Sequence, residues 1–250
     1  MTAAVLFALA GGGLWWALPA IASAIVDLVP FETERKIGDN LLATVPWKYC
    51  GTPAGVAALD DLTGKLSTSH RDMPLSVRVV DFSLVNAFAL PGGQIVILRG
   101  LLDQARSSDE LAGVLAHEMT HSFKRHSLKG LVASSGMSLL FEIATGGSGI
   151  GNLGQFALGQ SFTRSMEAEA DAGAIELLRG AHIATSGFAD FFDRLAEHDS
   201  RGGLPPFLMS HPDLKERSTL ARGEKIGDAT PALAADQWTA LKGICAVKGS

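Results

Sequence analysis

The pattern of hydrophobic and polar positions predicts a mainly helical chain. Residues 33–45 and 54–66 have mixed helical patterns, and from Gly100 the sequence is typical of helices almost to its end. Ser107 and Glu110 fit a capping box at the start of one such helix. A second long helix is predicted from about residue 156, after the glycine-rich segment 146–154. Further helices are predicted at 186–199, 213–222 and 233–246.

Three short apolar segments predict a small sheet. Residues 76–81 (SVRVVD) alternate as a strand does, and residues 94–98 (QIVIL) are apolar and rich in β-branched side chains. The sequence Pro-Gly-Gly at 91–93 predicts a turn between the second of these and residues 86–89. The fold class expected is therefore α+β, mainly α, with a sheet of about three strands.

The N-terminal segment is the most hydrophobic part of the chain. Residues 1–26 carry no charge, and 20 of them are hydrophobic. A helix of this length would reach about 39 Å, more than the roughly 30 Å hydrocarbon core of a bilayer. We predict a membrane segment at 1–29. Two alternatives stay open: a cleaved secretion signal, because small residues occur at positions 20, 22 and 24, and a buried or interfacial helix of the domain.

Composition assigns the remainder, residues 30–250, to one globular domain. The chain has 250 residues, 47% of them hydrophobic, and a formal net charge of −5. This length and composition exclude a disordered or disulfide-dense protein. Without clustered Lys and Arg there is no basis for binding phosphate backbones, so no nucleic-acid partner is expected.

The chemistry is concentrated in the sequence His117-Glu118-Met119-Thr120-His121. Two histidines at i and i+4 lie on one face of a helix and can bind one zinc ion together. Glu118 can then accept a proton from a water molecule that the metal activates. The spacing therefore predicts a hydrolytic zinc centre, with a helix bearing two solvated histidines as the alternative.

A catalytic zinc needs a third protein ligand, and a later helix offers one. Glu167 and Asp171 are also at i and i+4, so Glu167 can bind the metal while Asp171 accepts the outer N–H of a ligand histidine. Alanines at 168, 170, 172 and 174 are expected to let the two helices approach. Glu169 points elsewhere and is expected to be solvated, and the alternative for the whole segment is an acidic, solvated face.

Three motifs together resemble a known family. The HEMTH helix, the MEAEAD segment at 166–171 and the NAFALPGG segment at 86–93 are similar to the zinc metalloendopeptidases that include CAAX prenyl protease, HtpX and BepA, in the gluzincin group. The resemblance covers roughly residues 30–225. It implies a gluzincin-like domain with one zinc ion held by His117, His121 and Glu167, with Glu118 as general base and Asp171 as the partner of His117.

The resemblance also implies a substrate-binding edge strand and a second catalytic segment. An extended substrate would add to the exposed edge at Asn86, Ala87, Phe88 and Ala89 by main-chain hydrogen bonds. His211, followed by a proline and by Arg217, is similar to the family's His-Pro loop and its arginine. His211 is expected to stabilise the oxyanion or to occupy the open position on zinc, with a surface His-Pro turn as the alternative.

The other histidines and the two cysteines complete the inventory. His70, His126, His182 and His198 have no partner at ligand spacing and are expected to be surface or core residues. The two cysteines belong to no CxxC pair, so thiolate metal binding is not expected. Cys50 and Cys245 can form a disulfide, which would indicate an oxidising compartment, or remain two buried thiols.

The sequence thus predicts a zinc metalloendopeptidase that hydrolyses extended or misfolded proteins. From the resemblance we expect a membrane-anchored bacterial protein with a periplasmic catalytic domain, acting in protein quality control of the cell envelope. The sequence offers only one membrane segment, so a chamber of many membrane spans, as in CAAX prenyl protease, is not expected. The alternative is a zinc-stabilised chaperone or adaptor that binds extended segments with little proteolysis, although such a protein needs no general base.

Overall fold

The computed structural model describes residues 24, 26–134, 162–199, 211, 214–224 and 226–246. The fold is mainly helical with one small sheet, which confirms the predicted class. The helices are α2 (Phe31–Ala43), α3 (Pro53–Leu66), α4 (Arg99–Gln104), α5 (Ser108–Phe123), α8 (Arg164–Gly180), α9 (Ser186–Asp199), α11 (Leu214–Gly223) and α12 (Ala235–Lys242). A further helical stretch, residues 126–134, follows α5 after a short turn.

The sheet has three strands in the order β1-β3-β2. β1 (Ser76–Val80) runs parallel to β3 (Gln94–Leu98), and β2 (Ala87–Leu90) runs antiparallel to β3. The turn η1 (Pro91–Gly93) joins β2 to β3 with positive φ at Gly92 and Gly93. A Cβ at Gly92 would lie 2.2 Å from the Cα of Arg35, so α2 can pack on this turn only because the residue is glycine.

The sheet separates two hydrophobic cores, and this explains the continuous apolar run of β3. Ile95 and Ile97 face a core formed with α3, α5, α8, α9 and α12. Val96 and Leu98 face a smaller core formed with α2 and residues 126–134. Because successive side chains of a strand point to opposite faces, a strand buried on both sides needs apolar residues at every position.

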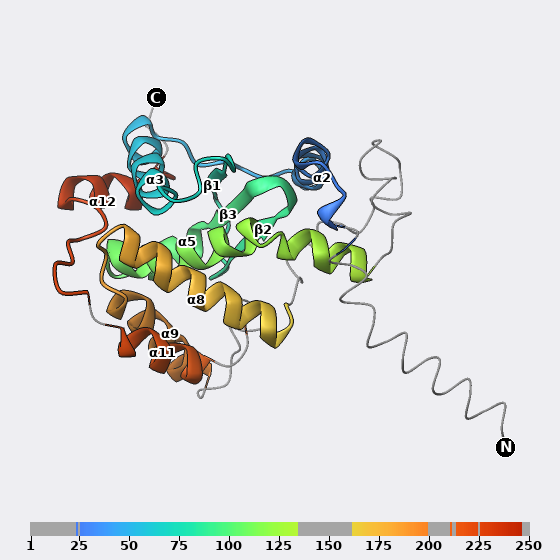
Figure 1. The fold of residues 1–250 in the computed structure, drawn as a ribbon. Coiled ribbons are helices and arrows are strands. Elements are labelled where there is room, and N and C mark those ends of the chain that lie inside the picture. The colour runs from blue at the N-terminus through green and yellow to red at the C-terminus, as the bar shows by residue number, and fades with distance from the viewer. Residues whose placement is uncertain are drawn as a thin grey trace, which may run out of the picture.

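Figure 1 shows how these elements surround α5. α8 and α9 both pack against α5, the sheet lies against another side of α5, and α11 packs on α9. α3 and α12 pack together at one end of the molecule, whereas α2 lies beyond the sheet at the other. The active-site helix expected from the sequence is thus the central element of the domain.

α8 begins later than predicted. It starts at Arg164, because Thr163 caps it by accepting a hydrogen bond from the backbone N–H of Met166. The predicted start near residue 156 is therefore wrong, and the glycine-rich segment 146–154 lies outside the described residues. At the other end of the domain, α12 stops at Lys242, short of the predicted residue 246.

The close contact between α5 and α8 is made by different residues from those expected. Ala170 and Ala174 are buried, but Ala168 and Ala172 are exposed, because alternate positions cannot share one face of a helix. The tightest approach is at Gly173, where a Cβ would lie 2.3 Å from Cγ2 of Thr120. The absent side chain of Gly173 therefore sets the distance between the two helices.

The start of α5 is capped largely as predicted. The Ser107 hydroxyl accepts a hydrogen bond from the backbone N–H of Glu110. The Glu110 carboxylate reaches back to the N–H of Arg106 rather than to that of Ser107, and it also pairs with Arg194 of α9. The capping interaction therefore also fixes α9 against the active-site helix.

Cys50 and Cys245 form a disulfide with their Cα atoms 4.4 Å apart, joining positions 195 residues apart in the sequence. Cys50 also donates its backbone N–H to Val79, and Thr52 donates to the carbonyl of Ile244. The C-terminal end of the domain is therefore attached directly to the segment that leads into α3.

The membrane prediction concerns residues that the structure barely describes. Of the segment 1–29, only residues 24 and 26–29 are described. Among the helices in the described ranges, none combines the length and the apolar character needed to cross a bilayer.

Candidate metal centre

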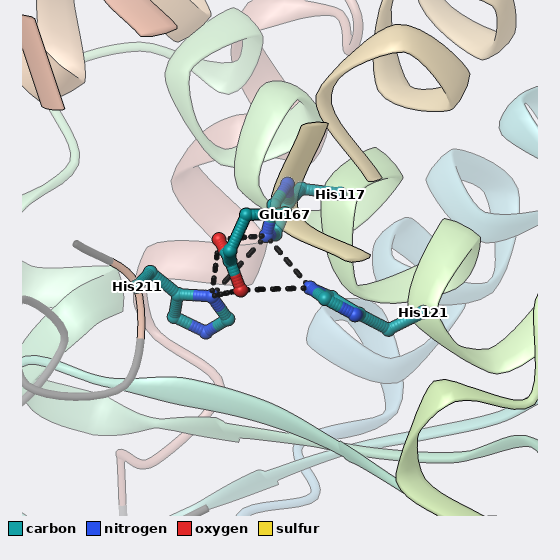
Figure 2. Close-up of side chains that lie close together, drawn as sticks. All are labelled: His117, His121, Glu167 and His211. Carbon is teal, nitrogen blue, oxygen red and sulfur yellow. Dashed lines mark hydrogen bonds and ion pairs between the residues drawn. The ribbon is translucent and has the colours of Figure 1, made fainter. Parts of the chain in front are cut away.

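Four side chains from three parts of the chain converge on one buried point. His117 and His121 come from α5, Glu167 from the first turn of α8, and His211 from the segment before α11. One ligand atom from each lies within 4.8 Å of the others, and all four residues are buried. Figure 2 shows the imidazoles and the carboxylate pointing toward one another.

The separations between these atoms suit a tetrahedral ion. Nε2 of His117 lies 3.0 Å from Nε2 of His121 and 3.3 Å from Nδ1 of His211. The Glu167 oxygens lie 3.5 Å from His121 Nε2 and 3.6 Å from His117 Nε2. Four ligands about 2.05 Å from a common zinc ion would be about 3.3 Å apart. The donor set of three imidazoles and one carboxylate therefore fits zinc.

The protonation preferences of the two helix histidines also favour a metal ion. Burial lowers the pKa of His117 and of His121 well below the usual value, and neighbouring positive groups lower it further. Neutral imidazoles are the form that binds a metal. The site thus presents its ligands with lone pairs available.

Glu118 is held beside this cluster as a buried carboxylate. In the described part of the chain neither of its oxygens has a hydrogen-bond partner, and Nε2 of His211 lies 3.4 Å from Oε1. Burial raises the pKa of Glu118 to about 7. A buried carboxyl group with a pKa near 7 beside a metal site can both accept and release a proton.

Asp171 and Arg217 contact the side chains of the ligand cluster. Oδ1 of Asp171 lies 3.0 Å from Nδ1 of His117, the nitrogen that faces away from the ligand cluster. Burial raises the pKa of Asp171, and Arg217 opposes this shift. Arg217 also places Nη1 3.2 Å from Glu167 and lies over the ring of Phe192 at 4.3 Å. Arg217 therefore contacts two carboxylates of the site.

Two residues at the site were missed by sequence reasoning. Nδ1 of His126 lies 2.9 Å from Nδ1 of His121, and the ring of Phe162 stacks on His121 with centroids 3.8 Å apart. His126 is 1% exposed. It is therefore a core residue, one of the two expected outcomes, but its contact with His121 was not expected, because a turn at Lys124 and Arg125 redirects the chain after α5.

That turn is fixed by the first turn of α2 and by Val29, which precedes this helix. Arg125 has a φ of 55°, a conformation uncommon outside glycine. Its Nε donates to Glu34 at 2.7 Å, and its Nη2 donates to the carbonyl oxygen of Val29 at 2.7 Å. Glu34 is 2% exposed. The buried ion pair holds the strained backbone in place.

The edge strand lies next to Glu118. Leu98 donates to the carbonyl of Asn86, so by the antiparallel register the peptide groups of residues 86, 88 and 90 pair with β3, and those of Ala87 and Ala89 face the free edge. The carbonyl of Ala89 already accepts a hydrogen bond from the Ser127 hydroxyl at 2.6 Å. Of the residues 86–89 expected to bind substrate, Ala87 thus directs its peptide groups away from β3, and the residue is buried among the described residues.

His70 and His182 lie outside the cluster. His70 stacks on Phe123, and His182 pairs with Asp228. The side chain of His198 lies outside the described residues. Glu169 is largely exposed as expected, although its Oε2 lies 3.6 Å from Nε2 of His126.

The fold and the cluster define a class of protein: a gluzincin-like domain with an HExxH helix and a third ligand from a second helix. Residues 59–225 match Peptidase family M48, and the chain belongs to this family. Zinc is the metal that family M48 metalloproteases use, which agrees with the predicted cofactor.

Curated relatives are similar over much of the chain. A putative beta-barrel assembly-enhancing protease of Vibrio cholerae is 32% identical over 225 residues, which is 82% of this chain and 46% of the relative. Metalloprotease LoiP of Escherichia coli is 30% identical over 179 residues, 68% of this chain and 70% of that protein. The mitochondrial metalloendopeptidase OMA1 of Schizosaccharomyces pombe is 30% identical over 152 residues, 58% of this chain and 45% of that protein. The chain thus spans about half the length of several of these relatives.

Proposed function

We propose that this chain is a zinc-dependent metalloendopeptidase that hydrolyses extended or misfolded proteins in the bacterial cell envelope. In this proposal the segment 1–29 attaches it to a membrane and the catalytic domain lies in the periplasm. The observation that carries the activity is the buried carboxylate of Glu118, with its pKa raised to about 7, beside the cluster of His117, His121 and Glu167. The disulfide between Cys50 and Cys245 supports the oxidising compartment.

The residues of the site would share the work of peptide hydrolysis. Zinc held by His117, His121 and Glu167 would polarise the scissile carbonyl and acidify the attacking water. Glu118 would accept the proton of that water and pass it to the departing amine. The peptide groups of Ala87, which point away from β3, would align an extended substrate beside Glu118 by strand addition once this buried edge is uncovered.

His211 has two candidate roles in this scheme. Its Nδ1 lies among the ligand atoms, 3.0 Å from Oε1 of Glu167, where it would fill a fourth position on zinc. Moved away, its imidazole would be a donor for the oxyanion, a contribution of about 10²–10³ in turnover. If His211 closes the site, His211→Ala raises the rate of hydrolysis, and if it stabilises the oxyanion, the same change lowers it. A rate within twofold of wild type would contradict both roles.

The decisive experiment compares Glu118→Gln with the wild type. We measure zinc content and cleavage of a reduced, alkylated and therefore unfolded protein. Loss of a general base is expected to lower the rate by about 10²–10⁴ while zinc remains bound. Glu176→Gln, an exposed position on α8, is the control and is expected to behave as wild type.

A second candidate function is a zinc-stabilised chaperone or adaptor. The observation that favours it is the four-donor set, because structural zinc sites are closed by four protein ligands and catalytic sites keep one position open. A zinc-loaded wild type that binds the unfolded protein and cleaves it no faster than Glu118→Gln, together with an inactive His211→Ala variant, would favour this candidate over the protease.

A further inference from the structure

We propose that His126 is a positioning residue for the metal ligand His121. It accepts a hydrogen bond from Nδ1–H of His121 and so holds Nε2 of that ring toward the metal. The inference rests on the proposed function only for the presence of zinc. It gives His126, which lies outside the HExxH motif, a specific part in building the centre.

The contact between His121 and His126 restricts which ring donates the hydrogen bond and which accepts it. The two Nδ1 atoms are 2.9 Å apart, so one ring must donate and the other must accept. Nε2 of His121 faces the cluster, 3.0 Å from His117 Nε2 and 3.5 Å from Glu167 Oε1. A lone pair on Nε2 for the metal requires the proton of His121 to be on Nδ1, and His126 is then the acceptor.

The far side of His126 completes the arrangement. With Nδ1 accepting, the proton of His126 is on Nε2, which lies 3.6 Å from Oε2 of Glu169 on α8. Glu169 therefore faces the one N–H that this tautomer leaves unused. The face of the His121 ring is covered by Phe162, so the ring is restrained both at its Nδ1 and on its plane.

The choice of a histidine is consistent with the charge of the site. His117 donates its outer hydrogen bond, from Nδ1–H, to Asp171, in the usual pairing of a ligand histidine with a carboxylate. Glu118, Glu167 and Asp171 already place three carboxyl groups at the site, and the one guanidinium of Arg217 contacts two of them, Glu167 and Asp171. A neutral imidazole supplies the second acceptor without adding a fourth negative charge to the buried site.

The turn after α5 is what makes the contact possible. In an uninterrupted helix, residues five apart point about 140° away from each other. Arg125 breaks the helix in the left-handed conformation and is held there by Glu34 and the carbonyl of Val29. His126 then begins the next helical stretch with its ring directed back at His121.

The test distinguishes the effect of losing the hydrogen-bond acceptor from the effect of losing the ring of His126. His126→Phe keeps a ring of similar size but has no acceptor, whereas His126→Asn places an amide oxygen where Nδ1 stood. We measure zinc affinity by competition with a chromophoric chelator and record the thermal stability of the metal-free proteins. His126→Phe is expected to bind zinc about 10–100-fold more weakly, and His126→Asn to stay within about threefold of wild type. His70→Phe is the control.

Two results would overturn the proposal. The first is zinc affinity of His126→Phe within threefold of wild type. The second is an equal loss in both His126 variants, which would show that the acceptor is not what matters. Should His126→Phe not fold, ¹⁵N NMR of the zinc-loaded wild type decides: a His126 protonated on Nε2 supports the proposal, and one protonated on Nδ1 contradicts it. Because zinc affinity is the readout, an inactive wild type would refute the protease and leave this result standing.

Discussion

Arg217 binds the carboxylate of Asp171 through two nitrogens, with Nη2 2.8 Å from Oδ1 and Nε 2.9 Å from Oδ2. The same Oδ1 contacts the outer nitrogen of His117. The resemblance groups Arg217 with the catalytic segment, and in the structure this side chain contacts the metal ligand Glu167 at 3.2 Å as well as Asp171, the partner of His117. A two-point contact of this kind fixes the plane of the carboxylate.

Removal of Arg217 should therefore destabilise the folded protein. Arg217→Ala leaves Asp171 buried without its cation, and we expect a loss of about 3–5 kcal/mol in the free energy of unfolding, measured by urea denaturation. Arg222 is the matched control, because it pairs with Asp190 and Asp193 at the surface. Arg222→Ala should change the same quantity by less than about 1 kcal/mol. Equal effects of the two substitutions would contradict this account.

A methyl group at Gly173 should disturb the metal centre, although Gly173 is not one of the metal ligands. The Cβ of Gly173→Ala would lie 2.3 Å from Cγ2 of Thr120, so α8 must move away from α5 and carry Glu167 with it. We expect a cost of about 1–3 kcal/mol in stability, together with weaker zinc binding.

Gly180 provides the comparison within the same helix. A Cβ there meets no atom within 4 Å, so Gly180→Ala should be neutral or stabilising by up to about 1 kcal/mol, with unchanged zinc affinity. If both alanine variants bind zinc as the wild type does, Gly173 does not set the spacing of the ligand helices.

Reduction of the disulfide should lower the melting temperature. Cross-linking positions 195 residues apart restricts the unfolded chain, an effect of about 5 kcal/mol in the chain-entropy description. The double variant Cys50→Ser, Cys245→Ser should melt at the temperature of the reduced wild type. As an internal check, the melting temperature of the double variant should not change when reductant is added. If the melting temperature of the wild type does not change either, the disulfide does not stabilise the domain.

The sequence predicted those parts of the fold and site that depend on local periodicity. His117 and His121 share a helix face by their spacing alone, and the strand at 94–98 is marked by its unbroken apolar run. His126 and Phe162 could not be found this way. Their contacts with His121 depend on a left-handed residue at 125 and on where α8 begins, and neither is encoded in a repeating pattern. Likewise, the sequence marked the small residues of α8 but not which of them faces α5.

The guanidinium of Arg125 has a wider consequence. It donates hydrogen bonds to the carbonyl of Val29 and to the carboxylate of Glu34. The backbone of the same residue forms the turn between His121 and His126. The position of the residues at the start of α2 is thereby coupled to the orientation of the metal ligand His121. A displacement of Val29 or of the first turn of α2 would therefore act, through Arg125, on the turn that places His126 against His121.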